Sequence, residues 1–320
     1  MEKLSVWLDL WLNKFMKNII KQRTYDKYLY VINKQINPVL GEYNLNELSP
    51  FILQDFVTEK LKKGNLKTGQ GLSVSSIVGI MNVLKESLRY ARDLGLCDNI
   101  SAEKVKIPKP MEKMVTAFNR EDEEKIVAYC LNSSRNNHIG VVICLYTGIR
   151  IGELLALTWD DIDFDKMLLS VNKTAYKVKI NGQNKIMTYP PKTRSSVRVI
   201  PIAYKLCNIL KEMKEKARSN YVISTKFNKR VETRAYQKTY QCILNKIGVE
   251  YKNFHCLRHT FATRAIEIGM DVKTLSEILG HANSAITLSR YVHSMIEYKV
   301  EMINKMEKIF NFGNLHKVIL

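Results

Sequence analysis

The stretch from Lys106 to Val115 separates the chain into two parts. It contains Pro108 and Pro110, and no helical period of apolar residues runs through it. Proline lacks a backbone N–H donor and holds the preceding residue in an extended conformation, so this stretch suits a linker. A chain of 320 residues also exceeds one typical domain of roughly 150 residues. We therefore expect one domain over 1–107, a linker over 108–115 and a second domain over 116–320.

The first part has the patterns of a helical domain. Ser49 followed by Pro50 is a typical helix start and predicts a helix over 51–63. Thr24 is interpreted as the N-cap of a helix over 25–36, and a longer helix is expected over 73–94. Near the start of the chain, apolar residues recur at helical spacing: Leu4, Trp7, Leu8, Trp11, Leu12 and Phe15.

The second part combines helices with a β-rich segment, 168–202. Within it, Asn181-Gly182 lies between two strand-like runs and predicts a tight hairpin. This hairpin is either an added contact to DNA or a partner, or a plain surface hairpin. The apolar stretch 139–146 predicts a buried helix. The expected fold class is mostly α with a small antiparallel β-sheet, in which a helical N-terminal domain precedes a mixed α/β domain.

The charge of the chain indicates a polyanionic partner. The formal net charge is +19, and residues 1–107 carry 16 Lys and Arg against 11 Asp and Glu, while the remainder carries 34 against 20. Basic excess on both sides of a linker favours double-stranded DNA enclosed by two domains. An anionic membrane is the rival, but no long uncharged apolar run occurs in the sequence. Six scattered cysteines without a CxxC pair indicate a reducing cytoplasm and no zinc site.

A cluster of chemically active residues lies between 255 and 293. His255 and Arg258 are three positions apart in a helix-forming run, so both can project from one face. Gly280 ends a second helical stretch and places His281 in the turn beyond it. Tyr291 follows ten positions later. A guanidinium and imidazole donors can hold a phosphate while a phenol attacks it, so the cluster suits phosphoryl transfer.

This segment resembles the C-terminal motif of the tyrosine recombinases, the phage integrase family. The resemblance is carried by His255-x-x-Arg258-His259, Leu279-Gly280-His281 and Tyr291-x-His293, together with Thr147-Gly148-Ile149-Arg150 upstream and Lys192 on a turn. It implies a core-binding helical domain over 1–107 and a catalytic domain over 116–320. It also implies a site-specific DNA recombinase that cleaves and rejoins strands through a 3′-phosphotyrosine.

The resemblance assigns a role to each site residue. Two arginines would stabilise the non-bridging oxygens of the phosphate, a lysine would protonate the leaving 5′-oxygen, and a tyrosine would attack. His255 would be the general base, and His281 would donate to a non-bridging oxygen or position the nucleophile. Neither a metal nor a cofactor is expected. The full candidate set is Arg150, Lys192, His255, Arg258, His281 and Tyr291. Glu153, one turn after Arg150, either supports that arginine or forms a plain surface ion pair.

Two rival functions stay open at this stage. A type IB topoisomerase uses similar groups, and a catalytically silent regulator would keep the helix-turn-helix character of 254–279 without the chemistry. The tail, 295–320, carries one apolar helix face, with Ile296, Val300, Ile303, Met306 and Phe310. It either folds back on its own domain or, as the resemblance implies, docks on a neighbouring protomer in a tetramer on DNA.

Overall fold

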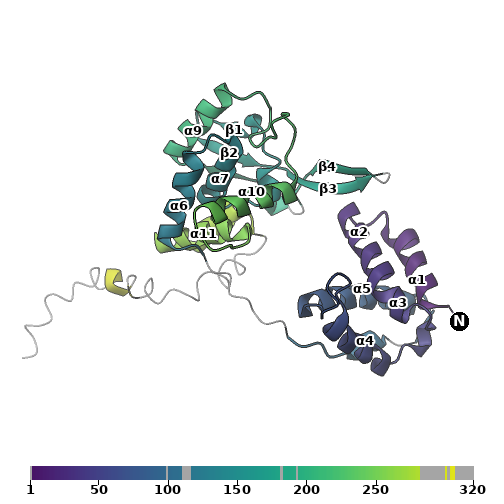
Figure 1. Ribbon diagram of the computed structural model, residues 1–320. Helices are drawn as coiled ribbons and strands as arrows, with labels where there is room; N and C mark the ends of the chain where they lie inside the picture. Colours follow the sequence, from purple (N-terminus) through teal and green to yellow (C-terminus); the bar gives the residue numbers. More distant parts are fainter. Residues whose placement is uncertain are drawn as a thin grey trace, which may run out of the picture. The chain divides into compact units, whose positions relative to one another are not determined.

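The computed structural model describes residues 2–98, 100–109, 117–180, 183–191, 194–281, 300 and 303–306. It divides into two compact units, Met1–Lys113 and Met114–Leu320, each with its own apolar core (Figure 1). The described elements are mostly helices, accompanied by two small antiparallel sheets. The predicted fold class is therefore confirmed. Within the described ranges, no helix has the length and apolar content that a bilayer crossing requires.

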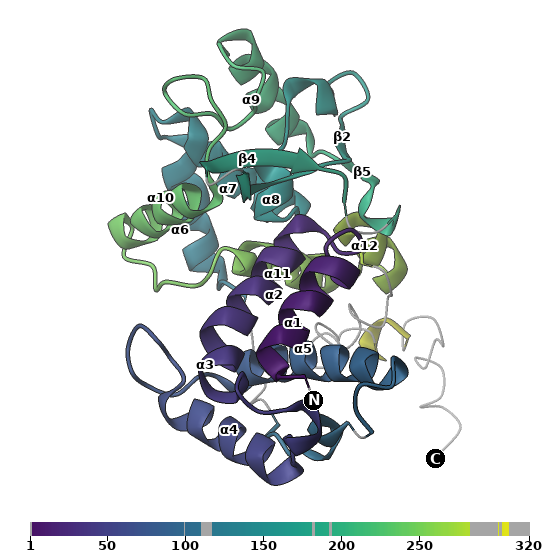
Figure 2. The same ribbon diagram turned by 90° about the vertical axis from the view of Figure 1, so that its right-hand side faces the viewer.

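The first unit is built from helices alone in its described part. Five of them are α-helical, namely α1 (Leu4–Leu10), α2 (Gln22–Val31), α3 (Asn37–Leu40), α4 (Pro50–Lys63) and α5 (Val74–Asp93). Two π-helical segments continue α1 and α2, namely η1 (Trp11–Met16) and η2 (Ile32–Ile36). Two short 3-10 turns complete the unit, namely η3 (Leu45–Glu47) and η4 (Ser101–Lys104). Figures 1 and 2 both show α1 and α2 side by side.

Aromatic packing and helix caps account for these elements. Trp7 and Trp11 are fully buried, and the Trp11 ring stacks on Tyr28 with 5.8 Å between ring centroids. Burial of one large apolar side chain stabilises a fold by roughly 1.5–3 kcal/mol. The Ser49 side chain caps α4 by accepting a hydrogen bond from the Ile52 amide, as the Ser-Pro pair predicted. The prediction of Thr24 as a cap is wrong, because α2 already begins at Gln22.

The second unit surrounds a buried central helix. Its longer helices are α6 (Arg120–Leu131), α7 (Ile139–Thr147), α9 (Tyr204–Glu215), α10 (Thr233–Lys246), α11 (His255–Glu267) and α12 (Val272–Leu279). Shorter ones are α8 (Ile151–Leu154), η5 (Asn136–His138), η6 (Trp159–Asp161) and η7 (Arg194–Ser196). Helix α7 is buried along nearly its whole length and packs against α6, α8 and α11. An apolar helix of this kind is stable only when other elements cover all its faces.

Two antiparallel sheets lie beside these helices. One joins β1 (Ile162–Asp163), β2 (Leu168–Val171) and β5 (Arg198–Pro201) in the order β1-β2-β5. The other is the hairpin of β3 (Thr174–Ile180) and β4 (Gln183–Tyr189), which projects from its unit in Figure 1. Its last pair, Ile180 opposite Gln183, leaves a two-residue connection, so the hairpin predicted from Asn181-Gly182 is confirmed.

Candidate active site

Two helices of the second unit end in the same way beside each other. Helix α7 ends at Gly148 and α12 ends at Gly280, and both glycines have a φ of +64°. This left-handed conformation is favourable for glycine because a Cβ would approach the backbone. A methyl group at Gly148 would also lie 2.6 Å from Phe261 Cδ1 and 2.7 Å from Leu279 Cδ2. The two helix ends are thus packed tightly together.

Arg258 joins these two helix ends. The side chain comes from the first turn of α11, and the residue is only 2% exposed. Its Nη1 donates to the Gly148 carbonyl at 2.8 Å, and its Nη2 donates to the Leu279 carbonyl at 2.7 Å. Carbonyls in the last turn of a helix lack partners within that helix. One guanidinium therefore satisfies a carbonyl from each helix end and fixes α7, α11 and α12 together.

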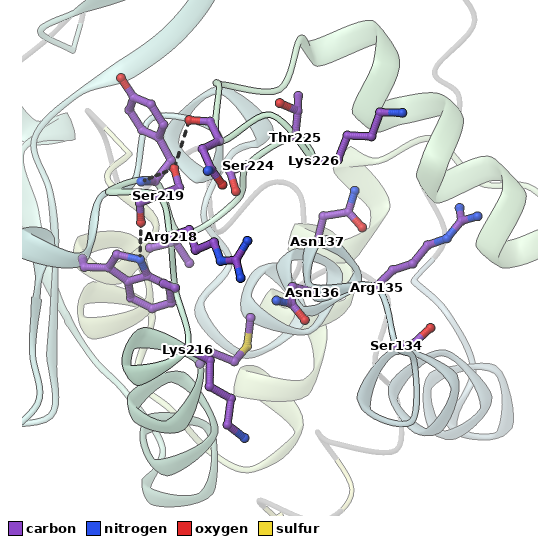
Figure 3. Close-up of a pocket in the computed structure, with 16 residues that line it drawn as sticks. Ser134, Arg135, Asn136, Asn137, Lys216, Arg218, Ser219, Ser224, Thr225 and Lys226 are labelled. Atoms are coloured by element: carbon purple, nitrogen blue, oxygen red, sulfur yellow. Dashed lines mark hydrogen bonds between the residues drawn. The ribbon is translucent and has the colours of Figure 1, made fainter.

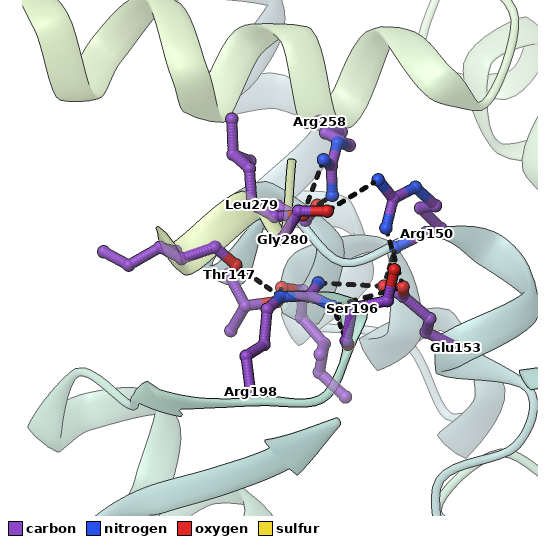
Figure 4. A network of polar contacts seen from close by, with 11 residues as sticks. Thr147, Arg150, Glu153, Ser196, Arg198, Arg258, Leu279 and Gly280 are labelled. Carbon is purple, nitrogen blue, oxygen red and sulfur yellow. Dashed lines mark hydrogen bonds and ion pairs between the residues drawn. The ribbon is translucent and has the colours of Figure 1, made fainter. Parts of the chain in front are cut away.

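Arg150 approaches the same point from α8. Its side chain is 37% exposed, and its Nη2 lies 3.4 Å from the Gly280 carbonyl. Figure 4 shows Arg150 and Arg258 turned toward the segment of Leu279 and Gly280. Arg150 is the N-cap residue of α8, and its backbone amide donates to Glu153 at 2.8 Å. The two predicted arginines, 108 residues apart by number, thus converge on one short segment.

Glu153 supports Arg150 from a buried position. Its carboxylate accepts hydrogen bonds from Arg150 Nη1 at 2.9 Å and from Arg198 Nη2 at 2.9 Å. The side chains of Glu153 and Arg198 are 5% and 6% exposed. Burial alone would raise the pKa of the Glu153 carboxyl, but the hydrogen bonds and charges of Arg198 and Arg150 hold this pKa below its ordinary value. The alternative of a plain surface ion pair is therefore wrong.

The histidines of the motif lie on α11, which carries Arg258, and directly after Gly280. His255 is the first residue of α11 and is exposed, and its ring meets the His259 ring edge-on with 4.7 Å between centroids. His281 follows Gly280 directly, and its amide donates to the Ser276 carbonyl. His281 therefore lies next to the carbonyls that Arg258 and Arg150 approach. Of the six predicted residues, Arg150, Arg258 and His281 come together in this way.

Lys192 and Tyr291 lie outside the described residues, as does most of the tail. For Lys192, the structure describes only the elements that precede and follow it. Strand β4 ends at Tyr189 and η7 begins at Arg194, so Lys192 belongs to the connection between them. Tyr291 follows the last residue of the continuous described range, His281. Their roles stay predictions.

Arg198 is the residue of the cluster that sequence reasoning missed. Arg198 lies in the run Val197-Arg198-Val199-Ile200. In strand β5, Val199 is 54% exposed, while Arg198 and Ile200 are turned inward. Strand residues two apart share a face, so the positions of the buried Ile200 and Ile202 indicate that Arg198 faces inward as well.

A second hollow of the unit lies apart from this cluster (Figure 3). It has a volume of about 650 Å³ and lies between η5 and the segment that follows α9. Arg135, Lys216, Arg218 and Lys226 line it, without an acidic side chain in the lining. Because η5 precedes α7 while Arg150 follows α7, a helix about 13 Å long separates this hollow from the arginine cluster. The hollow is therefore not the site of the predicted chemistry.

Comparisons with known proteins agree on one family. The profile of the phage integrase family matches residues 113–297, and that of the phage integrase N-terminal SAM-like domain matches residues 3–61. A XerC-like tyrosine recombinase from Caldanaerobacter subterraneus subsp. tengcongensis is 34% identical, over 75% of this chain and 68% of that protein. The transposase from transposon Tn916 of Enterococcus faecalis is 27% identical over 60% of this chain, and the match spans about half (51%) of its length.

Solved structures show the same fold. The Tn1549 transposon integrase in complex with a circular intermediate DNA superposes with a TM-score of 0.81 at 18% identity, covering 96% of this chain and all (100%) of that chain. A lambda integrase tetramer bound to a Holliday junction superposes with a TM-score of 0.68 at 17% identity, covering 91% of this chain and 77% of that chain. The family profile over more than half of the chain and the XerC-like relative at 34% identity show that the chain belongs to the phage integrase family of tyrosine recombinases, which are site-specific DNA recombinases.

Proposed function

We propose that this chain cleaves and rejoins DNA at specific sites through a covalent 3′-phosphotyrosine at Tyr291. The observation that carries this proposal is the convergence of Arg150, Arg258 and His281 on one turn. Arg150 comes from a segment more than 100 residues before the segments of Arg258 and His281. Two guanidinium groups with an imidazole beside them are suited to a phosphodiester in which negative charge develops on the non-bridging oxygens.

The proposed reaction needs each of the six predicted residues. The Tyr291 phenol has an ordinary pKa of about 10, so it reacts only after a base removes its proton. His255 would accept that proton as the phenol oxygen attacks phosphorus. The bond from phosphorus to the 5′-oxygen then breaks, and Lys192 would protonate the leaving oxygen. Religation is the reverse of these steps, so no ATP is consumed.

Arg150 and Arg258 would act on the phosphate in different ways. Arg150 is more than a third exposed, so its guanidinium can meet a substrate from outside. Arg258 is buried and holds the helix ends that carry His281, so its position is fixed before DNA binds. Donors that are already oriented cost little reorganisation when charge develops on the phosphate. His281 would donate to a non-bridging oxygen or position the tyrosine.

The two parts of the chain would divide the work. Residues 1–107 would bind DNA as the core-binding domain, 108–115 would serve as the linker, and 116–320 would carry the chemistry. The match of residues 3–61 to an integrase N-terminal domain and the basic excess of both parts support this division. The relatives named after transposons support strand exchange that moves a mobile element. The cytoplasm, where DNA is accessible and the six cysteines stay free thiols, would be its compartment.

Self-association through the tail would assemble the active tetramer. The described tail residues Val300, Ile303 and Met306 are 54%, 64% and 47% exposed, so their apolar surface is available for contact with a partner. The second unit offers an apolar groove of about 580 Å³ between α6, the end of α7 and α11. Tyr146 and Ile268 line this groove and are themselves well exposed. We assign the tail of a neighbouring copy to this groove.

Substitution of the proposed nucleophile tests the proposal. A Tyr291→Phe variant should bind site DNA as the wild type does but form no protein–DNA adduct that resists SDS on a nicked suicide substrate. The wild-type chain should form this adduct. A DNA-binding regulator would give no adduct with either protein. A topoisomerase would relax supercoiled DNA that lacks the selected site, which a site-specific recombinase would not do.

A further inference from the structure

Arg198, on strand β5, contacts four oxygen atoms on three separate segments. Its Nη1 and Nη2 donate to the two carboxylate oxygens of Glu153 at 3.2 and 2.9 Å. Nη1 also donates to the Ser196 carbonyl at 3.1 Å, and Nε donates to the Ile278 carbonyl. The side chain is 6% exposed, so these bonds are shielded from water. Figure 4 shows Arg198 beside Glu153, below the end of α12.

Two of these acceptors, Glu153 and the Ile278 carbonyl, belong to the segments that bind Arg150 and Arg258. Glu153 binds both the backbone amide and the Nη1 atom of Arg150, so its carboxylate sets the place of that side chain. Ile278 directly precedes the two residues whose carbonyls accept from Arg258 and Arg150. Arg198 therefore acts on both catalytic arginines through Glu153 and the end of α12.

The other contacts of Arg198 are with Ser196 of η7 and with Gly280, the residue before His281. Ser196 ends the η7 turn, which follows the connection that holds Lys192. The guanidinium also lies against Gly280, where a methyl group would be 3.0 Å from Arg198 Cδ and 3.1 Å from its Nη1. Gly280 is the residue before His281. One side chain thus contacts Glu153, which binds Arg150, and the end of α12, which binds Arg258 and precedes His281.

We propose that Arg198 is a positioning residue, which sets the relative placement of Arg150, the η7 turn and the end of α12. The inference rests on the proposed function, because it assigns Arg198 a part in that same reaction. Arginine suits this place since its planar group offers five N–H donors in fixed directions. An ammonium could hold the charge of Glu153 but could not reach the same set of acceptors from one position.

The anionic form of Glu153 is part of this arrangement. The carboxylate lies between the guanidinium groups of Arg198 and Arg150, which is why it stays ionised although it is buried. Removal of Arg198 would leave the buried Glu153 carboxylate paired with Arg150. Arg150 would then be drawn toward Glu153 and away from the substrate phosphate. A displacement of about 1 Å at a reacting centre can lower a rate roughly 100-fold.

The test measures cleavage and binding separately. The substrate is a nicked suicide duplex with a site selected from random DNA by the wild-type chain. The variants are Arg198→Lys, Arg198→Gln, Glu153→Gln and the double variant Arg198→Gln/Glu153→Gln. Lys205→Gln, an exposed basic position shortly after β5, is the matched control for loss of charge. Each protein is assayed for its single-turnover rate of adduct formation at saturating DNA, for its Kd and for its urea unfolding midpoint.

Arg198→Gln should slow adduct formation by roughly 10- to 100-fold, with a Kd near that of the wild type. Lys205→Gln should keep the wild-type rate. If Arg198 acts through Glu153, the loss in the double variant is smaller than the product of the two single losses. Single losses that multiply, or an Arg198→Gln rate equal to that of the wild type, would overturn the inference.

Two further outcomes need separate criteria, namely a variant that does not fold and a wild type that forms no adduct. Should Arg198→Gln fail to fold, Arg198→Lys keeps the charge opposite Glu153 and must still cleave more slowly than the wild type at unchanged Kd. A wild-type rate for this lysine variant would overturn the inference. If the wild-type chain forms no adduct, the proposed function fails and the role of Arg198 fails with it. An active wild type with equally active Arg198 variants refutes the positioning role alone.

Discussion

Gly148→Ala should destabilise the catalytic unit more than a chemically identical change at Gly248. Both glycines have nearly the same backbone conformation, with φ of +64° and +67°. An alanine at either position costs about 1 to 2 kcal/mol of backbone strain. A methyl group at Gly148 meets the Phe261 ring at 2.6 Å, whereas nothing lies within 4 Å of one at Gly248. The variant at Gly248 is therefore the control for strain.

The difference between the two variants isolates the packing contact. Overpacking of a core site costs about 1 to 3 kcal/mol, and this cost applies to Gly148→Ala alone. Such a difference corresponds to a factor of roughly 5 to 150 in an equilibrium constant for opening. Since the chain has two units, a single unfolding midpoint is ambiguous, and a local measurement is preferable.

Hydrogen–deuterium exchange of the α7 amides provides this local measurement. The slowest amides of 139–147 should exchange roughly 5 to 150 times faster in Gly148→Ala than in Gly248→Ala. The same variant should also slow adduct formation, because the Gly148 carbonyl accepts a hydrogen bond that holds Arg258. Equal exchange rates in the two variants would refute the claim that the α7 and α12 ends are packed in contact.

Two further predictions concern Glu153 and the tail. Because the folded pKa of Glu153 is depressed, its contribution to stability is fully present above its ordinary pKa of 4.5 and is lost as pH falls through the folded value. The stability difference between wild type and Glu153→Gln, measured by hydrogen–deuterium exchange of the second unit, should thus shrink in acid, and a constant difference would contradict the depressed pKa. Deletion of 296–320, or Ile268→Glu in the apolar groove, should leave binding to a single site intact but abolish tetramer assembly and strand exchange. Native mass analysis on paired sites checks this, and normal assembly by both variants would exclude the tail contact.

Local signals were sufficient for much of the fold. The caps at Ser49, Ser73, Asn119 and Asp271 each bind an amide within their own helix, so a few neighbouring residues determine them. The Asn-Gly turn likewise depends on two residues and their flanking strands. Thr24 failed as a cap because the helix begins earlier, where Lys21 has no side chain able to signal the start.

Only some residues of the candidate site could be predicted from the sequence. Arg150, Arg258 and His281 were found because their motifs are short and each contains a glycine or histidine at a fixed spacing. The role of Arg198 depends on acceptors 45 and 80 residues away, and no local pattern contains that information. The buried ion pair of Glu153 has the same origin, because Glu153 lies on α8 and its partner Arg198 lies on β5.

The helix ends at Gly148 and Gly280 have an electrostatic consequence. The C-terminal end of a helix acts as roughly half a negative charge. Helices α7 and α12 both direct this end at the arginine cluster, so together they contribute about one negative charge where a DNA phosphate would bind. Arg258, bonded to a carbonyl of each end, neutralises that charge almost completely. Loss of Arg258 would therefore leave the partial negative charge of both helix ends opposed to the attraction that Arg150 exerts on the phosphate.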